Sequence, residues 1–194
     1  MPFDPVHDTQ AIFRAAIRAV SYPGQVQDIR SATDGIDIGT DLNPALAGVA
    51  LTFLDAQASF CLWPGSETAS GLLIARVSDA RQADPEEAQY HLVPRGGDCR
   101  AAVERASSGT LEEPHRGATI VIEVDAITEG TRWRLEGPGI RDAAVLAATG
   151  LASAVLERRD ARCAEFPLGI DLLLVDRDCR LVALPRTTRI RRED

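Results

Sequence analysis

The most informative stretch of the sequence covers residues 166–188 and reads FPLGIDLLLVDRDCRLVALPRTT. Residues 170–175 form an apolar run that predicts a buried β-strand, and residues 180–184 predict a second strand. Arg177 and Asp178 lie between the two runs, which predicts a hairpin turn. Pro185 closes the second strand, and we expect an arginine- and threonine-rich tail to hang from it. The stretch therefore predicts two neighbouring strands inside the protein.

The sequence before this stretch alternates between helical and extended patterns. We expect helices at residues 8–20, 45–54, 67–77, 99–106 and 142–158, the last of which Gly150 could interrupt. We expect a loop at residues 33–39 and strands at residues 25–30, 58–63, 88–93, 119–124 and 131–135. The last two strands should pair as a hairpin across Glu129 and Gly130. The alternation predicts one domain over residues 1–194, with a three-layer α/β/α fold and a mixed β-sheet.

The first expected helix has clear local signals at both ends. Asp8 can cap its N-terminus, and the turn Tyr22-Pro23-Gly24 that ends it has the residues of a type II turn. The apolar residues of this helix gather on one side, with the exposed positions left to arginine: Ile12, Ala16 and Val20 share a face, and Phe13 and Ile17 lie beside it. The pair Asn43-Pro44 reads as the N-cap and first residue of the next long helix.

The composition excludes several kinds of chemistry. The protein has 194 residues, a formal net charge of -8 and 21 basic residues, all of which are arginine. A chain without lysine cannot form an internal aldimine with pyridoxal phosphate (PLP), so we expect no such cofactor. It also has no Walker A lysine and no Ser-Lys dyad. Either a genomic bias or selection for two-pronged anion contacts explains the all-arginine composition.

Cysteine usage and charge indicate the compartment and the class of partner. The four cysteines, Cys61, Cys99, Cys163 and Cys179, form no CxxC pair, so we expect reduced thiols in a cytoplasmic protein. The apolar stretches are far shorter than the roughly 18 residues of a membrane span. The acidic body argues against nucleic-acid binding. Residues 176–194 are locally basic, either as an anion or partner patch or as a solvated tail.

The loop Gly137-Pro138-Gly139-Ile140 is the first candidate anion site. It is expected between a strand and a helix, where backbone N–H groups can cradle a phosphate. The dinucleotide fingerprint would require glycine at position 142, which is Asp142. A plain tight turn therefore remains the alternative.

Two further candidates lie in the C-terminal stretch. Asp171 is placed beside a run of leucines, so its carboxylate needs a partner. It either forms a structural pair with an arginine or with backbone N–H groups, or it serves as an acid or base at a cleft. Arg186, Thr187 and Thr188 could bind phosphate or phosphonate oxygens, or could join the strand end to a neighbouring chain.

No metal site or hydrolase motif is expected. Glu112, Glu113 and His115 lie close together, but no HExxH or HxH spacing accompanies them. The sequence also has no GxSxG elbow. The residues alone therefore indicate an α/β domain that could face an anion, with no complete active site, and they leave open whether the protein is an enzyme.

Several motifs nevertheless resemble one bacterial family. The stretches FPLGIDLLL at residues 166–174 and LPRTT at residues 184–188 are similar to the PhnH subunit family of the carbon–phosphorus lyase system. So are LEGPGI at residues 135–140 and the first helix, from Phe13-Arg14 to Ser21-Tyr22-Pro23-Gly24. The resemblance covers nearly the whole chain and is looser between residues 65 and 115.

The resemblance implies a fold similar to the large domain of PLP-dependent transferases, without the cofactor. It implies a homodimer that joins PhnG, PhnI and PhnJ in a core complex. That complex attaches alkylphosphonate to the ribose of ATP with loss of adenine, and the family supplies no agreed catalytic residues. Two hypotheses follow. The chain is a non-catalytic subunit, or it binds phosphonate or nucleotide at an anion site of its own that includes Gly137, Gly139, Asp171, Arg186, Thr187 and Thr188.

Overall fold

The computed structural model of the protein describes residues 3–37, 42–63 and 68–193. Its helices are α1 (His7–Ser21), α2 (Arg30–Thr33), α3 (Pro44–Phe53), α4 (Ala69–Ser78), α5 (Cys99–Arg105), the 3-10 turn η1 (Pro114–Arg116) and α6 (Ser153–Arg162). Its strands are β1 (Gln27–Asp28), β2 (Ser59–Leu62), β3 (Arg81–Gln82), β4 (Tyr90–Val93), β5 (Thr119–Glu123), β6 (Ala126–Glu136), β7 (Ala144–Thr149), β8 (Asp171–Val175), β9 (Arg180–Leu184) and β10 (Arg189–Arg192).

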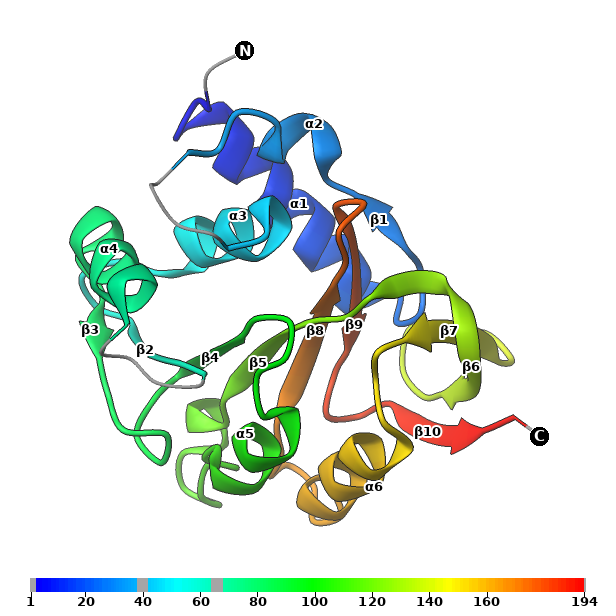
Figure 1. Cartoon of the computed structure of the whole chain (residues 1–194). Helices are drawn as coiled ribbons and strands as arrows, with labels where there is room; N and C mark the ends of the chain where they lie inside the picture. Colours follow the sequence, from blue (N-terminus) through cyan, green and yellow to red (C-terminus); the bar gives the residue numbers. More distant parts are fainter. Residues whose placement is uncertain (1–2, 38–41, 64–67, 194) are drawn as a thin grey trace.

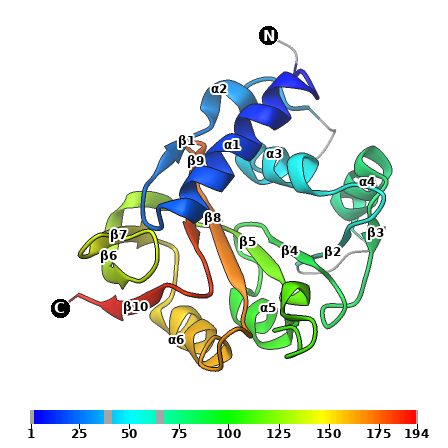
Figure 2. The same cartoon turned by 180° about the vertical axis from the view of Figure 1, so that it is seen from behind.

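The centre of the protein is a mixed seven-stranded sheet in the order β1-β9-β8-β5-β4-β2-β3. Strands β3, β2, β4, β5 and β8 pair in parallel, whereas β9 is antiparallel to both β8 and β1. Helices α1 to α4 cover one face, and α5, α6 and a second sheet cover the other (Figures 1 and 2). The α/β class and the mixed sheet predicted from the sequence are confirmed. Both faces are covered, as expected for a sheet with a parallel core.

The hairpin predicted in the most informative stretch is confirmed. Leu172 lies opposite Leu184 and Val175 opposite Leu181, so β8 and β9 pair along their whole apolar length. Both strands are buried from their second residue onward. Strand β8 takes the position beside β5 in the middle of the sheet, where near-continuous apolar sequence is expected.

The predicted helix at residues 142–158 is wrong in its first half. Residues 144–149 form strand β7, and α6 starts only at Ser153. Alanine favours helix, but burial here alternates, with Leu146 and Ala148 turned inward and Val145 and Thr149 exposed. Pairing with β6 therefore overrides the local propensity.

The predicted hairpin between residues 119–124 and 131–135 is also wrong. Strand β5 pairs in parallel with β4 on one side and β8 on the other, so it has no free edge for a third strand. Strand β6 instead leaves the large sheet and forms a three-stranded antiparallel sheet in the order β10-β6-β7. The expected hanging tail is wrong for the same reason, since residues 189–192 form β10 on the edge of β6.

The N-terminal elements differ from the prediction in detail. The strand expected at residues 25–30 shortens to β1, and α2 follows where its end was placed. The N-cap position of α1 is Val6 rather than the expected Asp8, and no side chain caps it. Asp4 Oδ1 accepts hydrogen bonds from the backbone N–H groups of Val6 and His7 at 2.8 and 3.0 Å, just before the helix. The predicted turn after α1 is present, with Gln25 N–H donating to Tyr22 O at 3.0 Å.

The predictions for helices α3 and α4 differ in how closely the structure follows them. Asn43 caps α3 as predicted, since its Oδ1 accepts from Ala45 N–H at 2.7 Å. Helix α4 starts at Ala69, after its N-cap Thr68, and ends one residue later than expected. Residue 67 of its predicted range lies outside the described residues, as do residues 38–39 of the predicted loop. Across the described parts of the chain, no helix is long and apolar enough to cross a membrane.

Candidate functional site

Three motifs that are far apart in the sequence meet at one place, which we call the junction: residues 21–24, 137–140 and 185–188. A side-chain carbon on Gly139 would collide with the carbonyl oxygen of Ser21, and one on Gly137 would come within 2.8 Å of Thr187 O. Both glycines have positive φ, at 80° and 142°. The glycine loop therefore packs between the turn after α1 and the segment before β10.

The glycine loop lacks the geometry of a phosphate cradle. It follows β6 as expected, but the element after it is strand β7, so no helix N-terminus points at the loop. Ile140 N–H donates to Gly137 O at 3.1 Å, which closes a tight turn. The expectation that rested on a following helix is therefore wrong.

Asp171 and Arg186 form a two-pronged ion pair at the start of β8. Arg186 Nη2 and Nε lie 2.5 and 3.1 Å from Asp171 Oδ2, and the Arg186 backbone N–H donates to Oδ1 at 2.6 Å. The remaining Arg186 contacts go to the carbonyl oxygens of Pro114, at 2.8 Å, and Gly117, at 3.3 Å. Every guanidinium nitrogen of Arg186 thus donates to a protein group, and its side chain is only 16% exposed.

Arg159 holds the other side of the same segment, and sequence reasoning missed it. Its side chain is 1% exposed beneath residues 184–188. Nη1 donates to Thr188 O and to Asp160 Oδ1, both at 2.7 Å, and Nη2 donates to the carbonyl oxygens of Leu184 and Pro185. No sequence signal separates Arg159 from its exposed neighbour Arg158, because only the packing of α6 decides which one turns inward.

A hollow of about 490 Å³ lies over this segment. Of the predicted site residues it brings together Arg186, Thr187 and Thr188, whereas Gly137, Gly139 and Asp171 do not line it. Among the described residues, Arg159 Nε and the buried Thr188 Oγ1 have no hydrogen-bond partner. Cys163 also lines the hollow, but burial raises the pKa of its thiol, which disfavours the reactive thiolate.

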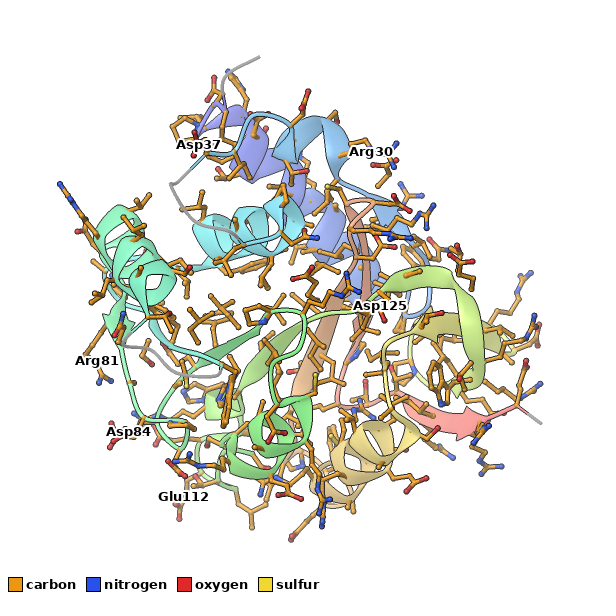
Figure 3. All side chains as sticks on the ribbon, in the orientation of Figure 1. Arg30, Asp37, Arg81, Asp84, Glu112 and Asp125 are labelled. Carbon is orange, nitrogen blue, oxygen red and sulfur yellow. The ribbon has the colours of Figure 1, made fainter. Side chains whose placement is uncertain are left out.

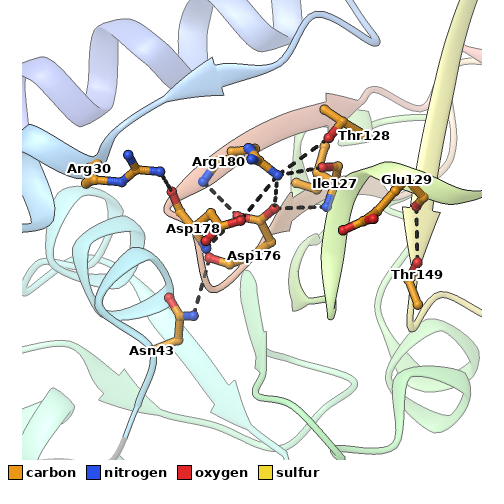
Figure 4. A network of polar contacts seen from close by, with 9 residues as sticks. All are labelled: Arg30, Asn43, Ile127, Thr128, Glu129, Thr149, Asp176, Asp178 and Arg180. Atoms are coloured by element: carbon orange, nitrogen blue, oxygen red, sulfur yellow. Dashed lines mark hydrogen bonds and ion pairs between the residues drawn. The ribbon is translucent and has the colours of Figure 1, made fainter.

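A buried carboxylate fixes the point where the chain passes from the large sheet to the small one (Figure 4). Asp176 is fully buried, and its Oδ2 accepts from Ile127 N–H at 2.9 Å. Its Oδ1 accepts from the backbone N–H groups of Asp178 and Arg180 at 3.0 and 2.9 Å. Arg180 Nη1 donates in turn to Ile127 O at 2.9 Å. These groups satisfy one another, so the cluster holds the fold and offers no open ligand position.

The histidines supply no metal or acid–base site within the described residues. His91 is fully buried, accepts a hydrogen bond from Trp63 Nε1 at 3.2 Å on Nδ1, and has its pKa lowered to about 4 by burial. Its imidazole is therefore neutral near pH 7. His115 is exposed, and Glu112 lies on the periphery of the molecule (Figure 3). No group of three potential ligand residues forms in the described ranges.

Helix α1 exposes a large apolar surface that the sequence pattern assigned to the core face and its flank. Phe13, Ile17, Val20 and Tyr22 are each between 45% and 50% exposed, and Arg14 and Arg18 flank them. Small residues make the contact with the sheet instead, because Ala16 and Ala19 lie buried with Ile12. An exposed apolar surface of this kind is typical of an interaction site. We call Phe13, Ile17, Val20 and Tyr22 the α1 face.

The comparisons with known proteins agree on one family. The family model described as "Bacterial phosphonate metabolism protein (PhnH)" matches residues 3–191. A protein of Rhizobium meliloti (strain 1021), named alpha-D-ribose 1-methylphosphonate 5-triphosphate synthase subunit PhnH, is 32% identical over 98% of this chain and 94% of its own length. A putative C-P lyase subunit protein, HtxG of Stutzerimonas stutzeri, is 34% identical over 93% of this chain and 85% of its own length.

The match spans the junction, the Asp171–Arg186 pair and the α1 face together, since it covers almost every described residue. The chain therefore belongs to the PhnH family of bacterial phosphonate metabolism proteins.

Proposed function

We propose that this protein is a subunit of a carbon–phosphorus lyase complex, required for the step that joins alkylphosphonate to the ribose of ATP with loss of adenine. Its relatives are named as subunits of such assemblies. We further propose that the chain contributes structure rather than catalysis, as a homodimer that joins PhnG, PhnI and PhnJ in the cytoplasm. The four free cysteines fit that compartment.

The α1 face carries this proposal. Four large apolar side chains on one helix and its following turn stay in contact with water, which is costly unless a partner covers them. Phe13 also stacks at an angle on Phe53, with ring centroids 5.9 Å apart, so the face continues onto the end of α3. A rigid helix with apolar anchors fits a protein partner better than a small ligand.

From the family resemblance we propose a fold similar to the large domain of PLP-dependent transferases. We also propose that the chain acts without PLP. All of its 21 basic residues are arginine, so no side chain could form the aldimine. Arg186 and Asp171 are bonded to each other and to backbone groups, which supports a structural role for both.

Substitution on the α1 face tests the structural proposal. We expect Ile17→Asp to shift the protein from dimer to monomer in sedimentation, and to weaken co-elution with co-expressed PhnG, PhnI and PhnJ, because a charge would enter an apolar contact. The melting temperature should change little, since Ile17 is already half exposed. Ala11→Asp places the same charge at an exposed position on another side of α1 and is the matched control. A monomeric wild-type protein that does not co-elute with these subunits would contradict the proposal.

One observation favours a second candidate function, an anion site in the hollow over residues 185–188. Three arginines, Arg159, Arg186 and Arg189, line it with the hydroxyls of Thr187 and Thr188. A phosphonate or nucleotide bound there should raise the melting temperature of the isolated protein. Arg189→Ala should abolish that shift and spare the fold, because Arg189 is the exposed arginine of the three. No shift with millimolar methylphosphonate or ATP would remove this candidate.

A further inference from the structure

The outer side of the small sheet carries an unusual set of charges for this acidic protein. Along β6 and β10 the residues alternate, so Trp133, Leu135 and Ile190 pack toward the core. The opposite side presents four arginines, which we call the arginine face: Arg132, Arg134, Arg189 and Arg191. The whole chain has a net charge of -8, so this concentration of cations on one sheet runs against its composition.

The strand register places two of these cations directly opposite each other. Arg191 lies across from Arg134 in the antiparallel pair β6–β10. Like charges at directly opposed positions destabilise a sheet, because their side chains are within a few ångströms. The isolated protein therefore accepts an unfavourable contact in the middle of the arginine face.

The carboxylates nearby compensate only part of this charge. Glu136 is 2.9 Å from Arg134, and Glu193 is 3.0 Å from Arg132. Hydrogen bonding to Arg134, followed by the nearby charges of Arg134, Arg191 and Arg189, holds the pKa of Glu136 below its ordinary value. Within the described residues no carboxylate lies within ion-pair distance of Arg189 or Arg191. Arg189 lies directly opposite Glu136 on β6, so this one carboxylate is shared among Arg134, Arg189 and Arg191. The four arginines therefore outnumber the carboxylates beside them and leave a positive surface for an outside anion.

A hollow with both polar and apolar lining borders the arginine face, and Val26 and Val145 are its exposed large apolar residues. It holds about 260 Å³ and is lined by Val26, Val145 and Arg132, among others. Val145 is directly opposite Arg134 on the other side of β6, and its side chain is 42% exposed. A bound segment could therefore place an apolar side chain in the hollow and carboxylates over the arginines.

We propose that the arginine face docks an acidic segment of another subunit, which also carries an apolar side chain for the hollow. This proposal rests on the proposed function as a complex subunit. Charge complementarity names the partner's chemistry, because the excess of cations on this face favours carboxylates. The arginine face lies on β6 and β10 and the α1 face on a different element, helix α1 with its following turn (Figures 1 and 2), so the two faces can hold different partners.

Charged side chains on an edge strand can also serve only to prevent aggregation. Strand β10 is an edge strand of the small sheet, so that role needs to be separated from docking. Charge reversal separates the two roles. Glutamate protects an edge from pairing as arginine does, but it repels an acidic partner.

The test uses Arg191→Glu in the full chain, with the purified PhnG–PhnI–PhnJ subcomplex as the probe. The substitution places an opposite charge across from Arg134, so the melting temperature should not fall. Binding to the subcomplex should weaken about tenfold, and the steep salt dependence of wild-type binding should become shallower. Val145→Thr, which keeps the shape of the side chain but adds a hydroxyl, should weaken binding severalfold.

Arg76→Glu is the matched control, because Arg76 is an exposed arginine on α4, on the far side of the molecule from β10 (Figure 1). It should bind the subcomplex like the wild type. If the wild type binds and Arg191→Glu binds equally well, the docking proposal is overturned and the proposed function stands. If the wild type does not bind, both are overturned. If Arg191→Glu loses affinity only for an added single-stranded RNA, the face is a nucleic-acid site and the proposal is wrong.

Discussion

Arg159 and Arg186, which hold residues 184–188, and the arginines of the arginine face are used in opposite ways. Arg159 and Arg186 turn inward and donate to carbonyl oxygens of the loops around them. Arg189 and Arg191, only a few residues later, point outward without an ion pair among the described residues. The difference shows that arginine serves here both as a buried hydrogen-bond donor that stabilises loops and as an exposed charge. Which role applies depends on how α6, the segment after β9 and strand β10 pack, rather than on the local sequence.

Removing an inward arginine should have the largest effect on stability. Arg159→Met keeps an apolar side chain of similar length but leaves the carbonyls of Thr188 and Pro185 without their donor. We expect a loss of about 4 kcal/mol in the free energy of unfolding, typical of breaking a buried charged contact. Urea denaturation measures this loss. Arg158→Met, next to it on α6 and half exposed, is the control and should cost less than about 1 kcal/mol. Equal losses of unfolding free energy in Arg159→Met and Arg158→Met would contradict the distinction between inward and outward arginines.

The same contrast between inside and outside applies to histidine and predicts a pH dependence. The pKa of His91 is about 4 in the folded protein and 6.5 in its ordinary state, so the unfolded chain binds the proton more readily between these values. Stability should therefore be complete above pH 6.5 and should fall by about 3 kcal/mol as the pH decreases toward 4. Urea titrations at several pH values measure it. His91→Gln should flatten that part of the profile, and the exposed His115→Gln should leave it unchanged.

Arg186 tests whether a family motif is structural. We expect Arg186→Ala to lower the free energy of unfolding by about 2 kcal/mol, because Asp171 and two backbone carbonyls lose their donor while remaining partly exposed to water. The neighbouring exposed Arg189→Ala should change it by less than about 0.5 kcal/mol. Thermal and urea unfolding of both variants would sharpen the comparison. A stable Arg186→Ala protein that fails only in phosphonate use would instead support the anion site.

The sequence predicted the elements whose signals are local. The apolar runs at β8 and β9 and the short link between them specify a hairpin wherever they are placed. The Asn43-Pro44 pair specifies the start of α3 through one side-chain hydrogen bond. Such features depend on residues close in sequence, so the local sequence is sufficient to predict them.

The largest errors concern strand partners that local propensity does not reveal. Residues 144–149 are alanine-rich and lack a strong strand signal, yet β6 provides a pairing edge and makes them a strand. Residues 189–192 become β10 only because β6 leaves the large sheet and presents its other edge to them. In both cases the hydrogen-bonding partner lies outside the window in which propensity acts.

The candidate site shows the same division. Sequence patterns selected Asp171, Arg186 and the two junction glycines, and pairing of Asp171 with an arginine or backbone N–H group was one of the two alternatives. They could not show that the partner is Arg186, or that the glycine loop packs against Ser21 and Thr187. Arg159 was missed, since only the packing of α6 turns it inward. The exposure of the α1 face was also missed, since small alanines on α1 allow close packing on the sheet and leave the larger apolar residues outside.

The sequence by itself determined the α/β class, the central hairpin and the exclusion of lysine chemistry, because strand burial and residue type are properties of short segments. Only the tertiary structure decided the small sheet, the burial of Arg159 and Arg186, and the exposure of the α1 and arginine faces. These outcomes depend on which strand edges and helix sides remain free after the large sheet has formed, and that is a property of the whole chain.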